Sequence, residues 1–319
     1  MKVTHPFGFV TGCHAGDRFM VQATLASMRH YCPDVPICLT VDGDFDISDL
    51  AEDYQLIVLR IADLPSVQMR RMIGGSFHAK QAAMWEGPFE RFVWLDSDAI
   101  VWGDFTKQIL DNVDFQILWS EVSLPADADT VPDWLPHFYF DPVRLGEFDS
   151  EFEWRGLPYF SAGVYAARRN AINYDHYCRI KELGERQPGL FAWGDMGMLN
   201  YMVHSLAQRG EMRCTMTDLQ HVWAHHGSAE FESDCRGSGW QFPTRIARPR
   251  IGHFCGRKPH LFDRKSYSKP FTIARLEHYR RHRGEAGAWL AVLEEERKVL
   301  WEKIQRRLLR NTNPKNQSA

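Results

Sequence analysis

Residues 91–104, RFVWLDSDAIVWGD, decide the fold that we predict for this chain. The apolar run 92–95 is typical of a short buried strand, and it ends directly in Asp96, Ser97 and Asp98. In an open α/β sheet, ligands bind in the crevice outside the carboxyl ends of the strands. The stretch therefore predicts a buried strand that delivers two carboxylates to the binding edge of a sheet.

Two carboxylates separated by one residue can turn toward a shared hard cation, Mg²⁺ or Mn²⁺, which in turn can neutralise a diphosphate. The alternative is a solvated turn, because Asp and Ser favour turns and this tripeptide also occurs by chance in loops. The apolar strand before Asp96 and four further stretches favour the metal site.

Composition limits the classes of protein that fit. The chain has 319 residues and a net charge of -3, as expected for a globular protein with one large domain and additions, and it gives no electrostatic case for nucleic-acid binding. We find neither an apolar leader nor a run of the ~18–20 apolar residues that a spanning helix needs. Seven scattered cysteines without a C-x-x-C pair fit a reducing cytoplasm and small buried side chains better than structural zinc.

The first hundred residues alternate between strand and helix patterns. We expect strands at 7–11, 37–41 and 56–61, and helices at 17–31, 47–53 and 77–85. Strands that alternate with helices imply right-handed crossovers and a mainly parallel sheet. This part is therefore predicted to be a nucleotide-binding type of α/β half domain.

The middle of the chain is less regular. Residues 115–119 are typical of a strand, whereas 124–158 form an irregular, aromatic-rich insertion, either an acceptor-binding lid or a surface flap packed by its own aromatics. The stretch 159–167, YFSAGVYAA, is predicted to be a strand in which Ala162 and Gly163 allow a close approach. Helices are expected at 174–183 and 194–206.

Five stretches together resemble the GT-A nucleotide-sugar glycosyltransferases, especially family 8, which includes bacterial lipopolysaccharide glycosyltransferases and glycogenin. They are the opening strand and loop, FHAKQAAMWEGPFERFVWLDSDAIVWGD, FSAGVYAARRN, FAWGDMGMLNYM and GHFCGRKP, which span residues 7–259. The resemblance implies an α/β GT-A (Rossmann-like) fold, with a mainly parallel sheet flanked by helices. It also implies a catalytic domain at 1–284, with a nucleotide-binding half at about 1–104 and an acceptor and metal-closing half at about 105–284.

By this resemblance, Asp96, Asp98 and His253 are the metal ligands, and the cofactor is Mn²⁺ or Mg²⁺. Neutral imidazole and carboxylates suit Mn²⁺. Without the resemblance, His253 would be read as a packed or exposed loop histidine. Asp195 is implied to hold hydroxyls of the donor sugar at the catalytic centre, although an N-terminal cap of the following helix is an alternative role.

The resemblance also assigns residues to the donor. Lys258 would meet the diphosphate, where its charge stabilises the leaving group, and Gly256 would let the backbone approach the phosphates. The resemblance places Lys80 near the donor, and the alternative for it is a solvated lysine on a helix. The donor-binding residues implied are Thr11, Lys80, Ser97, Ser161, Ala162, Gly163, Gly256 and Lys258.

Three departures from the family pattern affect the details. Thr11, Gly12 and Cys13 stand where the family commonly has an Asp that reads uracil, which leaves the base open. Met196 replaces a frequent Gln. Lys258 lies one residue closer to Gly256 than usual, so Arg257 is a second candidate for its role.

The function implied is metal-dependent transfer of a hexose from a nucleotide-sugar, with UDP expected, to a hydroxyl of a glycan or glycolipid, with retention of configuration. One alternative is a catalytically silent nucleotide-sugar-binding protein of the same fold. A haloacid-dehalogenase-type phosphotransferase also uses Asp-x-Asp with Mg²⁺, but its first strand ends in a nucleophilic Asp that FGFVTG lacks.

Residues 285–312 have the pattern of a basic amphipathic helix. We expect its apolar side to pack on the catalytic domain or on a second copy in a homodimer. The alternative is that the helix binds the anionic surface at the inner face of the cell membrane, because its second half, residues 297–310, carries six basic residues against one acidic residue. Residues 313–319 are expected to be disordered. The apolar side consists of Trp289, Leu290, Leu293, Leu300, Trp301, Ile304 and Leu308.

Overall fold

The structure, a computed structural model, describes residues 3–119, 122–123, 125, 127–192, 194–222 and 229–312. The chain divides into two compact units. The first comprises Met1–Val222 and Arg248–His253, and the second comprises Trp223–Ala247 and Phe254–Ala319. The tail at 313–319 lies outside the described residues, so its expected disorder remains a prediction.

A seven-stranded sheet in the order β10-β6-β9-β4-β1-β2-β3 forms the centre of the first unit. Parallel pairs join β1 to β2, β1 to β4, β2 to β3 and β10 to β6, whereas β9 runs antiparallel to both β4 and β6. The mainly parallel sheet predicted from the sequence is confirmed. The strands are β1 His5–Cys13, β2 Ile37–Val41, β3 Ile57–Arg60, β4 Phe89–Leu95, β6 Phe115–Ile117, β9 Val164–Arg168 and β10 Cys214–Met216.

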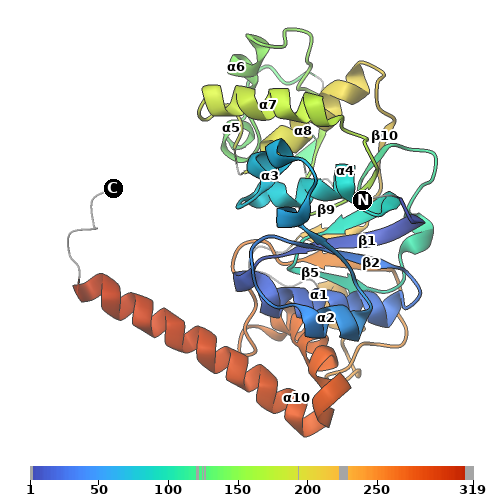
Figure 1. Ribbon diagram of the computed structural model, residues 1–319, viewed down its shortest axis with the longest axis vertical. Coiled ribbons are helices and arrows are strands. Elements are labelled where there is room, and N and C mark those ends of the chain that lie inside the picture. Colours follow the sequence, from blue (N-terminus) through green and yellow to red (C-terminus); the bar gives the residue numbers. More distant parts are fainter. Residues whose placement is uncertain are drawn as a thin grey trace. The chain divides into compact units, whose positions relative to one another are not determined.

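Helices cover both faces of this sheet (Figure 1). Because side chains alternate along a strand, Phe92 and Trp94 of β4 pack toward one face, and Val93 and Leu95 pack toward the other. The face of Val93 is covered by α1 Arg18–Tyr31 and α2 Ser48–Tyr54. The face of Trp94 is covered by α3 Val67–Ile73, α4 Ala82–Glu86, α7 Tyr174–Arg186 and α8 Met196–Gln208.

Local signals explain where several helices begin. Asn173 accepts hydrogen bonds from the backbone N–H groups of Asp175 and His176, and Ser66 accepts one from Met69. Asp141 caps a short helix, α6 Pro142–Gly146, which has proline in its first turn. Such N-terminal caps stabilise a helix by about 1 kcal/mol.

A second sheet, with three strands in the order β11-β12-β5, positions part of the site. Strand β12 Arg250–His253 pairs antiparallel with β5 Ala99–Trp102 and parallel with β11 Gln220–Val222. In this register His253 lies opposite Ala99. The pairing therefore places His253 beside the residue that follows Asp98.

The described part of the insertion at 124–158 contains more regular secondary structure than predicted. It contains α5 Trp134–Phe138 and α6, and it is bounded by a two-stranded pair, β7 Val122–Ser123 and β8 Pro158–Tyr159. Leu135, Phe140 and Leu145 are completely buried in the main core. The insertion thus contributes to the core of the first unit and is not only a surface flap packed by its own aromatics.

Two sequence predictions differ from the structure in detail. The expected helix at 77–85 starts as a 3-10 turn, η3 Phe77–Gln81, and becomes α-helical only in α4. The expected strand at 159–167 is interrupted between β8 and β9, because residues 160–163 turn toward the site. The sequence reading also missed α3.

The second unit contains α9 Ala229–Asp234 and the long α10 Lys265–Thr312, which is broken at Gly284 (φ 61). The two halves of α10 pack through Leu276, Ala288 and Val292. The guanidinium of Arg275 is buried between the carboxylates of Glu295 (2.7 Å) and Glu296 (2.6 Å). No described helix is both long and apolar enough to cross a membrane.

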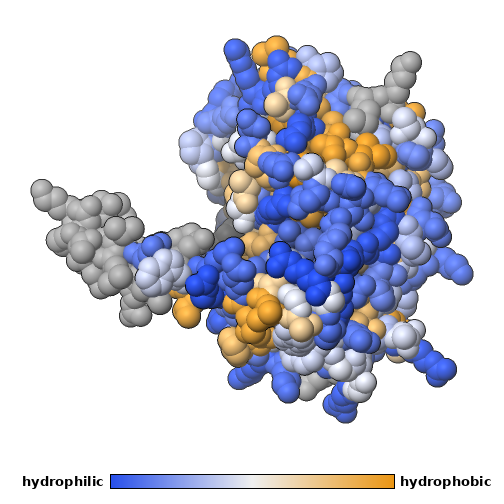
Figure 2. Space-filling view, turned by 60° about the horizontal axis from the view of Figure 1, so that its bottom comes forward, coloured by the Kyte–Doolittle hydropathy of each residue, from blue (hydrophilic) through white to orange (hydrophobic). Residues whose placement is uncertain are grey.

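Of the apolar side of the C-terminal helix, the side chains of Ile304 and Leu308 lie outside the described part of the structure, and Trp289 packs against Trp240. Hydrophobic side chains gather beside the described part of α10 (Figure 2), and a surface pocket of about 340 Å³ lies there. The exposed members of the apolar side are Leu290, Leu293, Leu300 and Trp301. Ala288, Ala291 and Val292 are buried instead, and the expected packing of the apolar side on the catalytic domain or on a second copy stays a prediction.

Candidate metal and donor site

Asp96, Asp98 and His253 converge at the carboxyl end of β4. Their candidate ligand atoms all lie within 4.8 Å of one another. The Nε2 atom of His253 is 3.3 Å from Oδ1 of Asp98 and 3.8 Å from Oδ2 of Asp96. Asp98 and His253 are buried, and Asp96 is partly exposed. The three residues assigned to the metal from the sequence therefore form one cluster.

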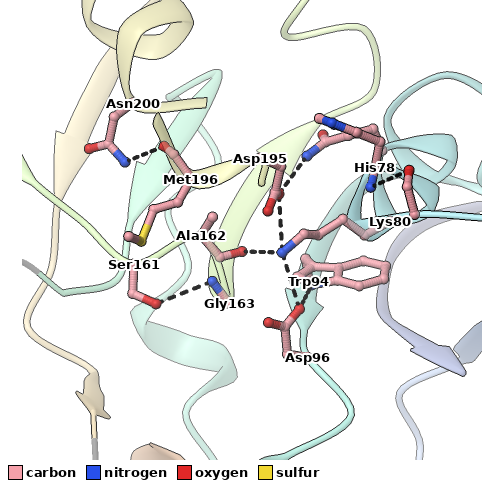
Figure 3. Close-up of polar contacts among 12 residues, drawn as sticks. His78, Lys80, Trp94, Asp96, Ser161, Ala162, Gly163, Asp195, Met196 and Asn200 are labelled. Carbon is pink, nitrogen blue, oxygen red and sulfur yellow. Dashed lines mark hydrogen bonds and ion pairs between the residues drawn. The ribbon is translucent and has the colours of Figure 1, made fainter. Parts of the chain in front are cut away.

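The two oxygens of Asp96 have different surroundings (Figure 3). Oδ1 accepts a hydrogen bond from the indole N–H of Trp94 (2.7 Å) and faces the ammonium of Lys80 (3.4 Å). The backbone N–H of Asp96 donates to the carbonyl of Gly163 (2.8 Å). These contacts fix the carboxylate, and Oδ2 is the oxygen that faces His253.

Gly163 makes room for the imidazole of His253. A Cβ atom built on Gly163 would lie 2.1 Å from Cε1 and 2.7 Å from Nε2 of that ring, far closer than atoms can approach. The resemblance assigned Gly163 to the donor sugar. The structure gives it a steric role toward His253 as well.

Lys80 is buried in the turn η3, so the alternative of a solvated helix lysine is wrong. Its ammonium lies 3.1 Å from Oδ2 of Asp195 and donates to the carbonyl of Ala162 (3.2 Å; Figure 3). Burial acts against the charge, but Asp195 and Asp96 together raise the pKa of Lys80 above its usual value. Lys80 is therefore a charged group that links Asp96, in the cluster with Asp98 and His253, to Asp195.

Asp195 occupies the N-cap position of α8, but its side chain makes no capping hydrogen bond. The carboxylate is buried, and it accepts a hydrogen bond from the side-chain amide of Gln81 (3.2 Å) as well as facing Lys80. Gly194 before it has a positive φ of 63°, which turns the chain into the site. The structure thus gives no support to the capping alternative.

The remaining donor candidates lie in different surroundings. Thr11 is completely buried in β1, and its hydroxyl has no hydrogen-bond partner among the described residues. The carbonyl of Ser97 accepts from the hydroxyl of Thr24 (2.6 Å), which anchors the Asp96–Asp98 turn to α1. Ser161 Oγ accepts from the backbone N–H of Gly163 (3.4 Å).

Gly256 and Lys258 belong to the second unit. Gly256 has a positive φ of 79°, and the ammonium of Lys258 donates to the carbonyl of Phe254 (3.0 Å). Their roles toward a donor stay predictions.

Sequence reasoning did not identify three further residues of the site: Trp94, Gln81 and Gln220. Trp94 precedes Asp96 by two residues and Gln81 follows Lys80, so proximity in the sequence could have drawn attention to both. The side-chain amide of Gln220, on the neighbouring strand β11, lies within hydrogen-bond distance of Nδ1 of His253 (2.9 Å). No motif surrounds Gln220, so only the pairing of β11 with β12 reveals its position.

Comparison with solved structures gives the fold a precedent. The galactosyltransferase LgtC in complex with donor and acceptor sugar analogs superposes with a TM-score of 0.52 at 12% identity, over 86% of this chain and 95% of that one. This chain has the GT-A fold. An active-site mutant of LgtC gives a TM-score of 0.50 at 13% identity, over 86% of this chain and 95% of the other.

The bifunctional glycosyltransferase WbbM gives a TM-score of 0.51 at 11% identity, over 84% of this chain and 49% of WbbM. This chain therefore spans about half of that protein. No family model matches the sequence, and no curated protein matches it. The fold expected from the resemblance is confirmed.

Proposed function

We propose that this chain is a metal-dependent glycosyltransferase that moves a hexose from a nucleotide-sugar, with UDP as the expected nucleotide, to a hydroxyl of a glycan or glycolipid. Retention of configuration is part of the proposal. The observation that carries it is the cluster of Asp96, Asp98 and His253 at the carboxyl end of β4 in a GT-A fold. That edge of an open α/β sheet is where nucleotide ligands bind.

The residues present fit a divalent cation such as Mn²⁺ or Mg²⁺. Two carboxylates and an imidazole suit Mn²⁺, and Trp94 and Lys80 hold Oδ1 of Asp96 so that Oδ2 faces the cluster. When bound, the cation would neutralise the diphosphate of the donor and stabilise it as a leaving group.

The protein groups around the cluster have distinct roles in the proposal. Asp195 orients hydroxyls of the donor sugar. Burial raises the pKa of its carboxyl, and the ammonium of Lys80, 3.1 Å away, opposes this rise. Ser161 and Ala162 line the sugar site in the turn between β8 and β9. In the second unit, Lys258 or Arg257 supplies positive charge to the diphosphate, and the backbone at Gly256 approaches it.

A donor-hydrolysis screen tests this function. Enzyme with Mn²⁺ is incubated with nucleotide-sugars of different bases and sugars, and free nucleotide is measured. We expect turnover with one donor class that EDTA abolishes and that Asp96→Ala reduces at least about 100-fold, because the variant loses a ligand of the cation. A folded protein without turnover on any donor, yet with Mn²⁺-dependent thermal stabilisation by a nucleoside diphosphate, would identify the catalytically silent binding protein instead.

We further propose that the C-terminal helix contacts an anionic membrane at the inner face of the cell, where a glycolipid acceptor would be presented. Exposed Leu300 and Trp301 next to the basic Arg297 and Lys298 support this. A chain that ends at Lys298 keeps Glu295 and Glu296, the partners of Arg275. We expect this shortened chain to stay folded but to lose salt-sensitive cosedimentation with anionic vesicles. A change in oligomeric state instead would identify a homodimer contact.

A further inference from the structure

Gln220 is a buried amide that touches the metal-facing histidine. Its side chain is 2% exposed, and its Nε2 atom lies 2.9 Å from Nδ1 of His253. The opposite ring nitrogen, Nε2, faces Asp98 at 3.3 Å. The hydroxyl of Ser161 is farther from Nδ1, at 3.5 Å. Gln220 is therefore the shortest described contact of this ring nitrogen.

This arrangement corresponds to one tautomer of neutral His253. If the amide of Gln220 donates to Nδ1, the ring proton sits on Nε2 and points toward the carboxylate of Asp98. A cation bound between the carboxylates and Nε2 requires a lone pair there. The ring proton must then sit on Nδ1, where it needs an acceptor.

An amide can serve both tautomers, because it carries a donor on one side and an acceptor on the other. The amide oxygen of Gln220 has no hydrogen-bond partner among the described residues. A half-turn about its Cγ–Cδ bond therefore breaks no hydrogen bond to that oxygen, and it brings the oxygen to Nδ1.

We propose that Gln220 is a positioning residue for the metal site. With the site empty, its N–H group donates to Nδ1 of His253. With a cation bound, the amide has turned and its oxygen accepts the Nδ1–H, which directs the Nε2 lone pair to the cation. The inference rests on the metal site of the proposed function and adds a residue that acts through His253.

Mn²⁺ affinity of two variants tests the proposal, with calorimetry and the spectroscopic signal of free Mn²⁺ as readouts. Gln220→Leu removes both donor and acceptor, so we expect Mn²⁺ affinity to fall about 10–100-fold. Gln220→Glu keeps an acceptor for the Nδ1–H, so its Mn²⁺ affinity should stay within about threefold of wild type.

Gln116→Leu is the matched control. Gln116 is also a completely buried glutamine of the first unit, and its amide bonds to Gln108 and Thr217 outside the site. We expect this variant to lose stability and keep its Mn²⁺ affinity. Thermal unfolding of all three variants separates folding from binding.

The tautomer itself gives a second readout. Nitrogen NMR of labelled histidine, assigned with His253→Ala, should show the proton on Nε2 without metal and on Nδ1 with saturating Mg²⁺. A folded Gln220→Leu protein that binds Mn²⁺ as tightly as wild type would overturn the inference, as would a proton on Nδ1 in both states. If wild-type protein itself binds no Mn²⁺, the proposed metal-dependent function fails, which is a different result.

Discussion

Replacement of Gly163 by alanine is the most direct perturbation of the cluster that keeps the side chains of Asp96, Asp98 and His253 unchanged. The added methyl group would lie 2.1 Å from Cε1 of His253, whereas ordinary contact begins at 3.4 Å. The imidazole must therefore move by about 1.3 Å, the difference between the two distances. The backbone of Gly163 is held to Asp96 (2.8 Å), so the ring is the part that yields.

A movement of this size is large for a metal ligand. Ligand distances in metal sites hold within ~0.2 Å, so a ring displaced by more than an ångström no longer coordinates. We expect Mn²⁺ affinity to fall at least 100-fold, which is about 2.8 kcal/mol. The loss of folding stability should stay below about 3 kcal/mol, the usual cost of overpacking.

Calorimetric titration with Mn²⁺ checks the affinity, and circular dichroism with thermal unfolding checks the fold. Gly146→Ala is the control, because Gly146 ends α6 and a methyl group there meets nothing within 4 Å. It should match wild type in both measurements. A folded Gly163→Ala protein with wild-type Mn²⁺ affinity would refute the reasoning, since His253 then either tolerates the methyl group or does not bind the cation.

Two further predictions concern charged groups. Asp195→Asn leaves the buried Lys80 with Asp96 as its remaining carboxylate partner, so we expect urea unfolding to show a loss of about 3 kcal/mol in the free energy of unfolding. Adding Lys80→Met to Asp195→Asn should restore part of this stability. A double variant no more stable than the single one would contradict the pairing. Burial opposes ionisation of Glu296, but His260 and Arg275 hold the pKa of its carboxyl at about 2, below the 4.5 of an unperturbed glutamate. As the pH falls, the unfolded state therefore takes up the proton before the folded state does, and folding stability decreases between pH 4.5 and pH 2. Glu296→Gln should flatten the profile of melting temperature against pH in this window. An unchanged slope would exclude Glu296 as the source of the pH dependence.

The sequence predicted the sheet well because its strands carry local signals. The apolar run before Asp96 and the run at 37–41 are buried strands, and turn residues bound both. It predicted that Asp96, Asp98 and His253 come together because each lies in a recognisable motif. The break between β8 and β9 was missed because 159–167 is mostly apolar, with Ser161 as its one polar side chain besides the tyrosines, and apolar periodicity alone does not show where a backbone turns.

The roles of Gln220 and Gly163 toward His253 depend on contacts between distant segments. Gln220 and His253 meet because β11 pairs with β12, and a three-residue strand carries too little pattern to reveal such a pairing. Gly163 lies against the imidazole because β9 is antiparallel to β4 and begins directly after Gly163, with Val164 opposite Leu95. A sequence pattern gives residue types and local periods, not the distances between such segments.

The register of β12 against β5 also constrains how the site can form during synthesis. His253 follows Asp98 by 155 positions, yet it must pair opposite Ala99. During translation, Asp96 and Asp98 are synthesised long before β12, the strand that carries His253. Contacts between residues so distant in sequence also form slowly. A product that terminates before Arg250 would contain every described strand of the large sheet but lack His253. Under the proposed function, acquisition of the cation is thus expected to be a late event, after most of the first unit has been synthesised.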